Sequence, residues 1–324
     1  MPIDTDQIIR LFEKFWVNFV DNRLFGQMGL MLTIGLALMA SELLFQQWDK
    51  TAIYRVFVQR STTAKIDITI CLLQLFGLSS ILEVAFSLGL TIGASRLANY
   101  AYDHLAWARI TLPSDGPFQI AFSVLVYWVV QNFVAYWVHR VYHWPIFWNV
   151  HRFHHAAPEL NFLTMMRFHP AEPVLKIVFF LSPLLLLKTS DSILLIALIV
   201  SHVINFCQHS ELEWDWGWIG RWIFGSPYVH QVHHSLDEEH RDTNFCACPL
   251  WDHVFGTWYA GDKKPSGYGV TVNGAPDLGY DREPVMQFVR DTFAFYRQLG
   301  AWLVSPIVKV ISLLMRKSSR SGAF

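Results

Sequence analysis

Long apolar stretches alternate with polar segments along the first two thirds of the chain. Leu24–Ala40 carries no charge and its apolar character continues past Glu42, and Gly116–Val138 contains no Asp, Glu, Lys or Arg. About 20 apolar residues let an α-helix cross a bilayer. We therefore predict membrane-spanning helices over both stretches. A third is predicted over Ile68–Ala94, which Glu83 interrupts and which would be one tilted span or a bent pair.

Two shorter apolar arms follow, separated by a polar turn. Ile177–Leu187 and Ser192–Gln208 flank the turn Lys188–Asp191, and each arm is short for a full crossing. This pattern predicts a helical hairpin that enters the membrane and returns to the same face. We expect an all-α integral membrane protein with about four transmembrane helices or hairpins.

The ends of the chain have a different pattern. Ile8–Phe19 has the apolar spacing of an amphipathic helix that lies in the membrane interface. From Glu211 onward the chain is polar, which predicts a cytoplasmic cap, with a last apolar helix near Ala301–Met315. We divide the chain into membrane helices at 1–115, a catalytic domain at 116–262 with its hairpin at about 173–208, and a cytoplasmic tail at 263–324.

Composition supports a membrane protein. Hydrophobic residues make up 53% of the chain and charged residues 16%, where soluble domains are about one quarter charged. The 14 Trp residues suit a protein with several edges at the membrane–water interface. The net charge of -1 gives no basic field for nucleic acid, so no nucleic-acid partner is expected.

The loop charges predict an orientation. Four basic residues, Lys50, Arg55, Arg60 and Lys65, separate the first two apolar stretches, whereas the segment 96–115 is balanced. The positive-inside rule places the first loop in the cytoplasm. Counting crossings then returns His139 to that side, unless Ile68–Ala94 crosses twice.

The four cysteines and the N-terminus add little chemistry. Cys71 and Cys207 lie in apolar runs, and the single residue between Cys246 and Cys248 is not the spacing of a zinc or redox motif. We expect all four cysteines to be reduced and structural. Residues 1–21 lack the basic, apolar and small-residue pattern of a cleavable signal peptide.

Histidines form three clusters. His139-Arg-Val-Tyr-His143 has the spacing i, i+4, and both His151-Arg-Phe-His154-His155 and His230-Gln-Val-His233-His234 have the spacing i, i+3, i+4. Residues three and four apart share a helix face, so each cluster is expected to aim its imidazoles at one point. Isolated His104, His240 and His253 are better interpreted as solvated or hydrogen-bonded side chains. The clusters, in contrast, predict metal ligation.

The residue types and the number of histidines narrow the choice of metal. There is no His-Glu-x-x-His motif of a zinc protease, and the clusters hold no carboxylate at ligand spacing. A structural zinc site takes four ligands, whereas this chain offers at least eight imidazoles. Two redox-active iron ions fit the count best. Zinc, which binds such nitrogens more tightly than ferrous iron, can replace them in a purified sample.

These clusters and their neighbours resemble a known family. Tyr136-Trp-Val-His139-Arg-Val-Tyr-His143, the second cluster and Arg167-Phe-His169-Pro-Ala-Glu172 resemble the fatty acid hydroxylase / sterol desaturase superfamily. The third cluster, Arg241-Asp-Thr-Asn244-Phe245 and Trp251-Asp-His-Val-Phe-Gly-Thr257 are similar to its C-terminal signature, and the resemblance covers about 131–259.

The resemblance implies a ligand set, residue by residue. It assigns His139, His143, His151, His154, His155, His209, His230, His233 and His234 as metal ligands. No catalytic residue beyond these ligands is expected.

Other polar residues are candidates for the surroundings of the metals. Asn205 stands where some acyl hydroxylases of the family carry His, and it could hold a metal-bound water or cap the helix. His202 lies two turns below His209 and is either near the site or a core histidine. His169 fits the Arg-x-His-Pro signature behind the ligands.

Downstream of the last cluster, Asp252 is our first candidate to accept the second ring N–H of a ligand, with a turn cap as the alternative. Asn244 is repeated in the family with a less clear role. His253 is expected at the surface, where many relatives carry a basic residue.

The resemblance also implies a reaction. We expect oxidation of a C–H bond of a membrane lipid, a fatty acyl chain, sterol or related lipid, by dioxygen at a di-iron centre, giving an alcohol or an alkene. Electrons would come from a separate ferredoxin or haem protein with its reductase, because the sequence carries no fused haem or flavin domain. The alternatives are a di-zinc lipid hydrolase or isomerase, and a metal-binding membrane protein without enzymatic activity.

Overall fold

The computed structural model describes residues 28–105, 107 and 109–321, and no side chains at 178–181 or 307–321 are described. The amphipathic helix predicted at Ile8–Phe19 lies outside these residues. Helices dominate the described chain, as predicted, and two small two-stranded sheets accompany them.

In chain order the longer helices are α2 (Met28–Phe45), α3 (Thr62–Leu75), α4 (Leu78–Phe86), α5 (Leu90–Leu105), α6 (Pro117–Tyr142), α7 (Pro145–His155), α8 (Pro173–Leu186), α9 (Asp191–Gln208) and α14 (Pro284–Ser321). Short helices are α10 (Gly217–Trp222), α11 (Pro227–His233), α12 (Leu250–Phe255) and α13 (Gly279–Arg282). Single turns occur at η2 (Trp48–Lys50), η3 (Tyr54–Gln59), η5 (Phe162–Met166) and η6 (Glu238–His240). Strand β1 (Ile110–Thr111) pairs in parallel with β2 (Leu187–Lys188), and β3 (Thr271–Val272) pairs antiparallel with β4 (Ala275–Pro276).

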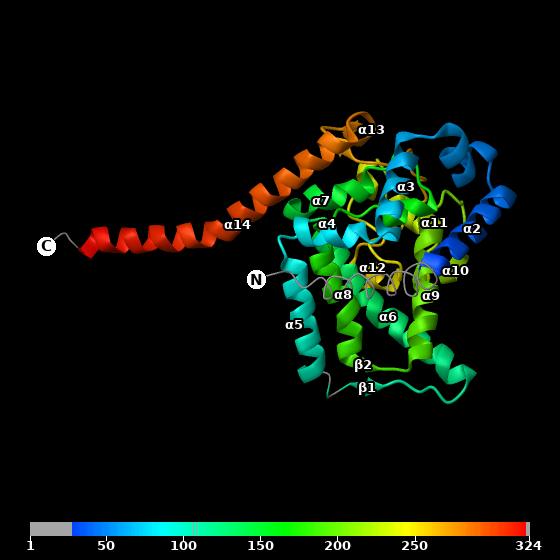
Figure 1. Ribbon diagram of the computed structural model, residues 1–324, viewed down its shortest axis with the longest axis horizontal. Helices are drawn as coiled ribbons and strands as arrows, with labels where there is room; N and C mark the ends of the chain where they lie inside the picture. The colour runs from blue at the N-terminus through cyan, green and yellow to red at the C-terminus, as the bar shows by residue number, and fades with distance from the viewer. Residues whose placement is uncertain (1–27, 106, 108, 322–324) are drawn as a thin grey trace, which may run out of the picture.

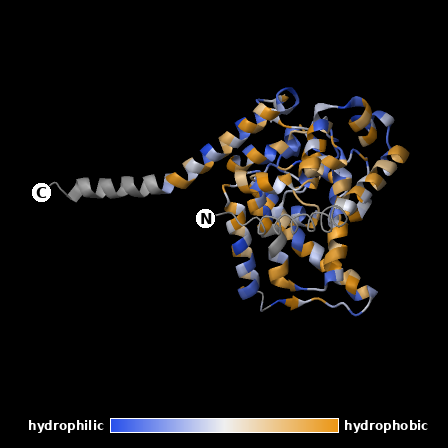
Figure 2. Cartoon of the chain, viewed as in Figure 1, coloured by the Kyte–Doolittle hydropathy of each residue, from blue (hydrophilic) through white to orange (hydrophobic). Residues whose placement is uncertain are grey.

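Helices α5, α6, α8 and α9 extend together from one side of the molecule toward the β1–β2 pair (Figure 1). Figure 2 shows hydrophobic residues predominating along α6 and α9. By length and composition α6 and α9 could each cross a membrane. Helix α6 therefore confirms a helix over the stretch predicted as a span at Gly116–Val138 and is a candidate span by length and composition.

The stretch predicted as one tilted span or a bent pair is bent. Helices α3 and α4 meet at 96°, so together they are a broken span or a re-entrant loop. Gly77 sits between them with φ 72, a left-handed conformation that most other residues avoid. Helices α2 and α8 are apolar but shorter than a full crossing. The described residues thus hold two candidate spans, or three with the bent pair, against about four predicted.

The predicted hairpin is present as α8 and α9, joined through β2. Ser190 caps α9 by accepting a hydrogen bond from the Ile193 backbone N–H. Leu187 of β2 packs against Tyr127 of α6 and Ala197 of α9 in one apolar cluster. This packing fixes α9 beside α6, so that both helices end at the same level of the molecule.

The C-terminal part differs from the prediction in one respect. The apolar helix expected near Ala301–Met315 is only part of α14, which starts at Pro284 and continues through Pro306. The first turns of α14 pack on α7, with Phe295 against Val150 and Ala171. The rest of the helix extends away from the body (Figure 1). Amphipathic spacing before Ala301 explains the longer helix, because hydropathy alone detects only its apolar end.

Candidate metal centre

The histidine clusters lie on helix ends that converge at the level where α6 and α9 finish. His139 is in the last turn of α6 and His143 is its C-cap, while α7 starts two residues later at Pro145. His209 is the C-cap of α9, and His234 is the C-cap of α11. Helices α6, α7, α8 and α11 all begin with proline, whose fixed φ suits the first helical position.

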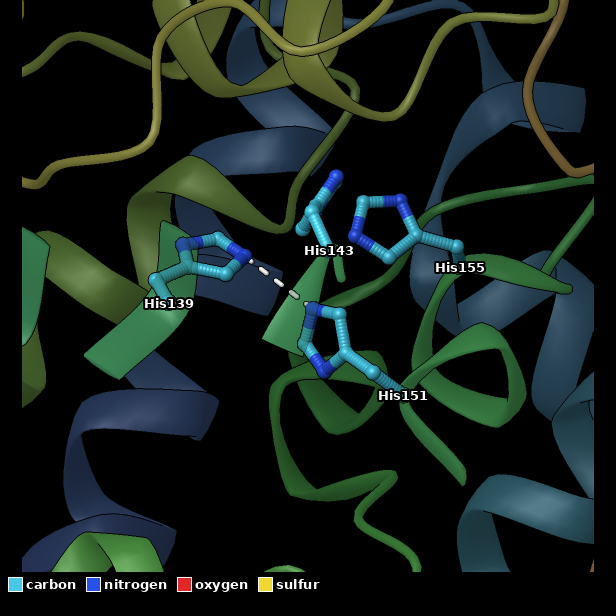
Figure 3. A group of neighbouring side chains, drawn as sticks. All are labelled: His139, His143, His151 and His155. Carbon is cyan, nitrogen blue, oxygen red and sulfur yellow. Dashed lines mark hydrogen bonds between the residues drawn. The ribbon is translucent and has the colours of Figure 1, made fainter. Parts of the chain in front are cut away.

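Four histidines from α6 and α7 form the first group. Each of His139, His143, His151 and His155 offers a ring nitrogen, and these nitrogens lie within 4.8 Å of one another. Figure 3 shows the four rings turned toward a common centre, with His139 and His151 closest. His233 of α11 adds a fifth ring, because its Nε2 is 3.1 Å from Nε2 of His139.

Histidines from three helices form the second group. His154, His209, His230 and His234 are all buried and also offer nitrogens within 4.8 Å of one another. Nε2 of His209 lies 3.2 Å from Nε2 of His154 and 3.1 Å from Nε2 of His230. Nε2 of His234 lies 3.0 Å from Nε2 of His230. All nine predicted ligands therefore lie in or against one of two adjacent groups.

The structure corrects how each cluster is used. Spacing alone suggested that one cluster aims at one point, but α7 sends His151 and His155 to the first group and His154 to the second. In α11, His230 and His234 belong to the second group, and His233 faces the first. The physical reason is the 3.6-residue turn: residues i and i+4 lie closer in direction than residue i+3, so each helix serves two centres.

Hydrogen bonds fix the tautomers of three rings. Nδ1 of His139 is 2.6 Å from the Phe245 carbonyl, and Nδ1 of His233 is 2.7 Å from the Thr243 carbonyl. Nδ1 of His209 is 2.7 Å from the carbonyl of Asn205. A carbonyl only accepts, so each Nδ1 carries the proton and each neutral ring presents a bare lone pair at Nε2.

Those lone pairs face one another. Nε2 of His139 and Nε2 of His233 are 3.1 Å apart with no proton to share. In addition, Nε2 of His143 and Nε2 of His155 are buried without a hydrogen-bond partner among the described residues. Converging lone pairs repel unless a cation lies between them. The donor set is one that iron, zinc, copper and nickel accept, so the residues fit a metal pair.

Protonation does not relieve this repulsion at neutral pH. Burial lowers the pKa of His151, His154 and His155 well below the ordinary value. The same cause lowers the pKa of His230, His233 and His234 well below it and that of His209 to about 4. Rings that stay neutral are the form that binds metal.

The spacing of facing nitrogens is compatible with a shared metal ion. Facing nitrogens of the pairs His139–His151, His154–His209 and His230–His234 are 3.0–3.2 Å apart. Two ligands about 2.1 Å from one metal ion would be roughly 3.0 to 3.4 Å apart. The two rings of each pair could therefore hold the same ion.

One short segment, the acceptor loop Asp242–Cys246, lies behind three of the predicted ligands. Its Thr243 and Phe245 carbonyls bind His233 and His139, and Asp242 Oδ1 is 3.0 Å from Nδ1 of His143. The hydrogen bond to His143 keeps the pKa of Asp242 below its usual value. Asp242 and Asn244 have φ of 57 and 53, a left-handed conformation that Asp and Asn tolerate better than most residues. Because these left-handed residues alternate with the others along the loop, successive hydrogen-bond acceptors face the histidines.

Asp252 and Asn244 anchor this loop. The Asp252 carboxylate accepts hydrogen bonds from the Phe245 and Cys246 backbone N–H groups and from the Thr257 hydroxyl. Asn244 donates to the Val229 carbonyl and accepts from the Tyr259 N–H. Asp252 was expected either to accept directly from a ligand or to cap a turn. Its described bonds go to the loop and to Thr257, and the Phe245 carbonyl accepts from His139 instead. Burial raises the pKa of Asp252 to about 7.

The other candidates lie at different distances from the two groups. Asn205 and His202 line a cavity beside the histidines, and the Asn205 amide donates to the Ser201 carbonyl. His169 is buried elsewhere, where its Nε2 lies 2.8 Å from the Thr292 hydroxyl and its ring stacks on Phe288. His169 therefore ties α14 to the segment before α8 rather than contacting a metal group.

One isolated histidine differs from the expectation. His240 is 1% exposed, not solvated, with its ring against Tyr259. His253 is half-buried between the rings of Trp222 and Trp258, and its Nε2 lies 3.1 Å from the Arg221 carbonyl, so it is a hydrogen-bonded side chain as expected. His104 is exposed and hydrogen-bonded to the Tyr100 carbonyl, as expected. The four cysteines are free, which confirms the prediction of reduced thiols.

Sequence reasoning missed two features of the site. The carbonyls of Asn205, Thr243 and Phe245 carry no sequence signal, because every residue has a carbonyl. Glu172, in contrast, ends the quoted Arg-x-His-Pro segment, and its buried carboxylate is 3.6 Å from Nδ1 of His151. Burial raises the pKa of Glu172 to about 7.

An apolar cavity of about 280 Å³ reaches the histidines from between α6 and α9. Its wall includes Trp128 and Val138 of α6 and Leu198 of α9, and the histidines that also line it are His139, His151, His154, His209 and His230. The cavity thus leads from the two histidine groups along the candidate spans α6 and α9. An apolar cavity of this kind takes an apolar ligand.

Parts of the chain are similar in sequence to known proteins. Residues 124–257 match the family model described as fatty acid hydroxylase. An alkylglycerol monooxygenase of Xenopus tropicalis is 27% identical over 180 residues, which cover 54% of this chain and 38% of the relative. Methylsterol monooxygenase 1-2 of Arabidopsis thaliana is 25% identical over 193 residues, covering 52% and 57%, respectively. Methylsterol monooxygenase 1-3 of the same plant is 23% identical over 184 residues, covering 52% and 58%.

The matched segments thus span between 38% and 58% of the length of these relatives. No solved structure matches the chain. The matched family residues 124–257 contain all nine histidines and the acceptor loop.

Proposed function

We propose that this chain, which carries a domain of the fatty acid hydroxylase family and belongs with the fatty acid hydroxylase / sterol desaturase superfamily, is a membrane enzyme that oxidises a C–H bond of a lipid with dioxygen. The relatives described above are monooxygenases by name, which supports the class of oxidoreductase. The proposed metal ligands are the nine histidines of the two groups, and the proposed metal is iron, one ion for each group.

The observation that carries the proposal is the convergence of neutral imidazole lone pairs beside an apolar cavity whose lining includes several of these rings. His139, His209 and His233 have their protons fixed on Nδ1 by carbonyls, so Nε2 is free for a metal. The cavity brings an apolar ligand to the same place. Lipid binding and metal binding would therefore meet at one point.

Iron bound by such nitrogens would supply the reduction of dioxygen and the oxidation of the C–H bond. The side chains of the protein have the tasks of binding and positioning. Trp128, Val138 and Leu198 would hold the hydrocarbon and exclude water, and the acceptor loop would keep the rings oriented. We propose a separate ferredoxin or haem protein with its reductase as electron donor.

The site is proposed to lie on the cytoplasmic face, as the loop charges predict. This placement depends on the count of membrane crossings before His139. The bent pair α3–α4 enters that count, because it is either one broken span or a re-entrant loop. The cavity between α6 and α9 would admit a membrane lipid laterally. A fatty acyl chain, a sterol or a related lipid has the apolar character that its walls require.

Comparison of membrane lipids by mass spectrometry, with and without the gene, tests the proposal. We expect one lipid class in which the gene-dependent species gains one oxygen or loses two hydrogens. The change should require dioxygen and stop when His154 is replaced by Ala. A gene-dependent hydrolysis or isomerisation that proceeds without dioxygen would overturn the proposal in favour of a di-zinc enzyme.

A further inference from the structure

The far half of α14, residues 301–321, leaves the body of the protein and extends away from the packed helices (Figure 1). Three consecutive apolar residues at its start, Trp302, Leu303 and Val304, are 60%, 56% and 51% exposed. Successive residues of an α-helix point about 100° apart, so these three side chains leave the helix in different directions. Among the described residues, this turn of α14 is therefore uncovered on more than one side.

The base of α14 is fixed to the elements that carry the histidines. Asp291 Oδ1 lies 3.4 Å from Nη1 of Arg152 on α7, and the Thr292 hydroxyl lies 2.8 Å from Nε2 of His169. One turn further, Phe295 is buried in an apolar cluster with residues of α7. The body of the protein therefore sets the direction in which the far half extends, since both halves belong to one helix.

The far half runs across the direction of the candidate spans. In Figure 1, α5, α6, α8 and α9 extend toward the β1–β2 pair, whereas the far half of α14 extends sideways and reaches the level at which α5 begins. Helices α6 and α9 are long and apolar enough to cross a membrane along that common direction. A helix that runs across them at this level would lie along a membrane surface.

The sequence of the far half suits the membrane interface. Residues 301–315 contain a single charged residue, Lys309, and the segment is shorter than the about 20 residues that a crossing helix needs. Trp302 stands near its start, and Trp is enriched where the membrane meets water. Length and composition thus favour a helix that lies in the interface over one that spans the bilayer.

The charge of this end of the chain specifies the kind of surface. Residues 292–324 contain five basic residues and no Asp or Glu, and Arg316, Lys317 and Arg320 directly follow the apolar segment. Basic residues beside an apolar helix strengthen its binding to anionic lipids. A second copy of the helix would carry the same positive charge, which opposes pairing between two chains. An anionic membrane is therefore the better partner.

We propose that the far half of α14 is an interfacial anchor that lies on an anionic lipid surface, on the side of the membrane where the histidine groups lie. The anchor does not depend on the reaction of the metal groups, so it goes beyond the proposed function. Because Asp291 and Thr292 tie the base of α14 to α7 and to the segment before α8, the anchor would hold these elements at a fixed height above the bilayer.

Electron paramagnetic resonance of a nitroxide label tests the proposal in the full-length protein. The label is attached to Leu303→Cys in a Cys71→Ser background, because the other three cysteines are buried. The protein is placed in vesicles of phosphatidylcholine, with or without phosphatidylserine. Oxygen concentrates in lipid and a neutral nickel chelate stays in water, so the ratio of the label's accessibility to the two reagents reports its depth.

The matched control is a label on Val272→Cys, an apolar residue of β3 that is 47% exposed and belongs to the cap. With phosphatidylserine present, we expect a several-fold higher ratio of oxygen to nickel accessibility at Leu303→Cys than at Val272→Cys, at the depth of the headgroups. Replacing Arg316, Lys317 and Arg320 together by Gln should lower the ratio at Leu303→Cys several-fold. Each basic residue contributes about fivefold to attraction by an anionic surface.

Equal ratios at Leu303→Cys and Val272→Cys in vesicles with phosphatidylserine would overturn the proposal. A depth at the centre of the bilayer would identify a crossing helix, and dipolar coupling between labels on two chains would identify a second copy as the partner; either result refutes the anchor. A high ratio that is the same without phosphatidylserine and in the Gln variant would refute the anionic surface.

Discussion

Asp242→Asn separates the contribution of one charge from the shape of the site. Asp242 Oδ1 is 3.0 Å from Nδ1 of His143, and Asn keeps an oxygen at that place. Asp242 has φ 57, which Asn also adopts readily, so the acceptor loop should keep its course. The substitution removes the negative charge behind a proposed ligand while leaving the nine imidazoles in place.

The expected effect is a modest loss of metal affinity. Groups that hold a ligating histidine from behind typically contribute 10- to 100-fold to metal affinity. Asp242 is 61% exposed, so solvent already screens its charge, and the Asn oxygen still accepts the His143 proton. We therefore expect the metal affinity of the first group to fall by about tenfold, or roughly 1.4 kcal/mol, which is near the low end of that range.

Competition with a chelator, followed by metal analysis, measures this affinity. The control is Asp215→Asn, another exposed carboxylate, which pairs with Arg221 on the cap and touches no histidine. Asp215→Asn should hold metal as the wild type does. The reasoning is refuted if Asp242→Asn retains wild-type affinity, or if both variants lose metal to the same extent.

Three further predictions concern residues in the two groups and behind them. His154→Ala or His233→Ala should abolish product formation while the protein still inserts into membranes, because insertion depends on apolar helices; product in either variant, measured by lipid mass spectrometry, would remove that residue from the ligand set. Asn205→His should change metal content or the ratio of alcohol to alkene, because Asn205 lines the cavity one turn before His209; unchanged metals, rate and products would favour a purely helical role. Asp252→Asn should destabilise the protein by about 1–3 kcal/mol in thermal unfolding, because an amide cannot accept from both the Phe245 and Cys246 N–H groups; an unchanged melting temperature would contradict this role.

The membrane helices were largely predictable because hydropathy reports directly on burial in lipid. The stretch Gly116–Val138 corresponds to α6 with Gly116 as its N-cap, and the turn predicted at Lys188–Asp191 lies between α8 and α9, with Asp191 starting α9. The bend between α3 and α4 was left open, since it depends on Gly77 in a left-handed conformation and on packing that hydropathy does not report. The full length of α14 was missed for a similar reason.

The histidine groups were predictable in membership but not in arrangement. Spacing along each helix placed His151 beside His155, but it could not assign His154 to a different group. That assignment depends on how α7, α9 and α11 are oriented relative to one another in the folded protein, which spacing along one helix does not report. The carbonyl acceptors behind His139 and His233 depend on backbone direction in the acceptor loop and therefore also required the structure.

The number of metal ions per chain tests the central claim most directly. The protein is purified without oxygen, loaded with ferrous iron, freed of unbound metal and analysed for metal and protein in the same sample. Two groups of converging imidazoles predict about two iron ions per chain in the wild type. A protein that retains no iron or zinc after loading, although it is folded and inserted in membrane, would contradict the account.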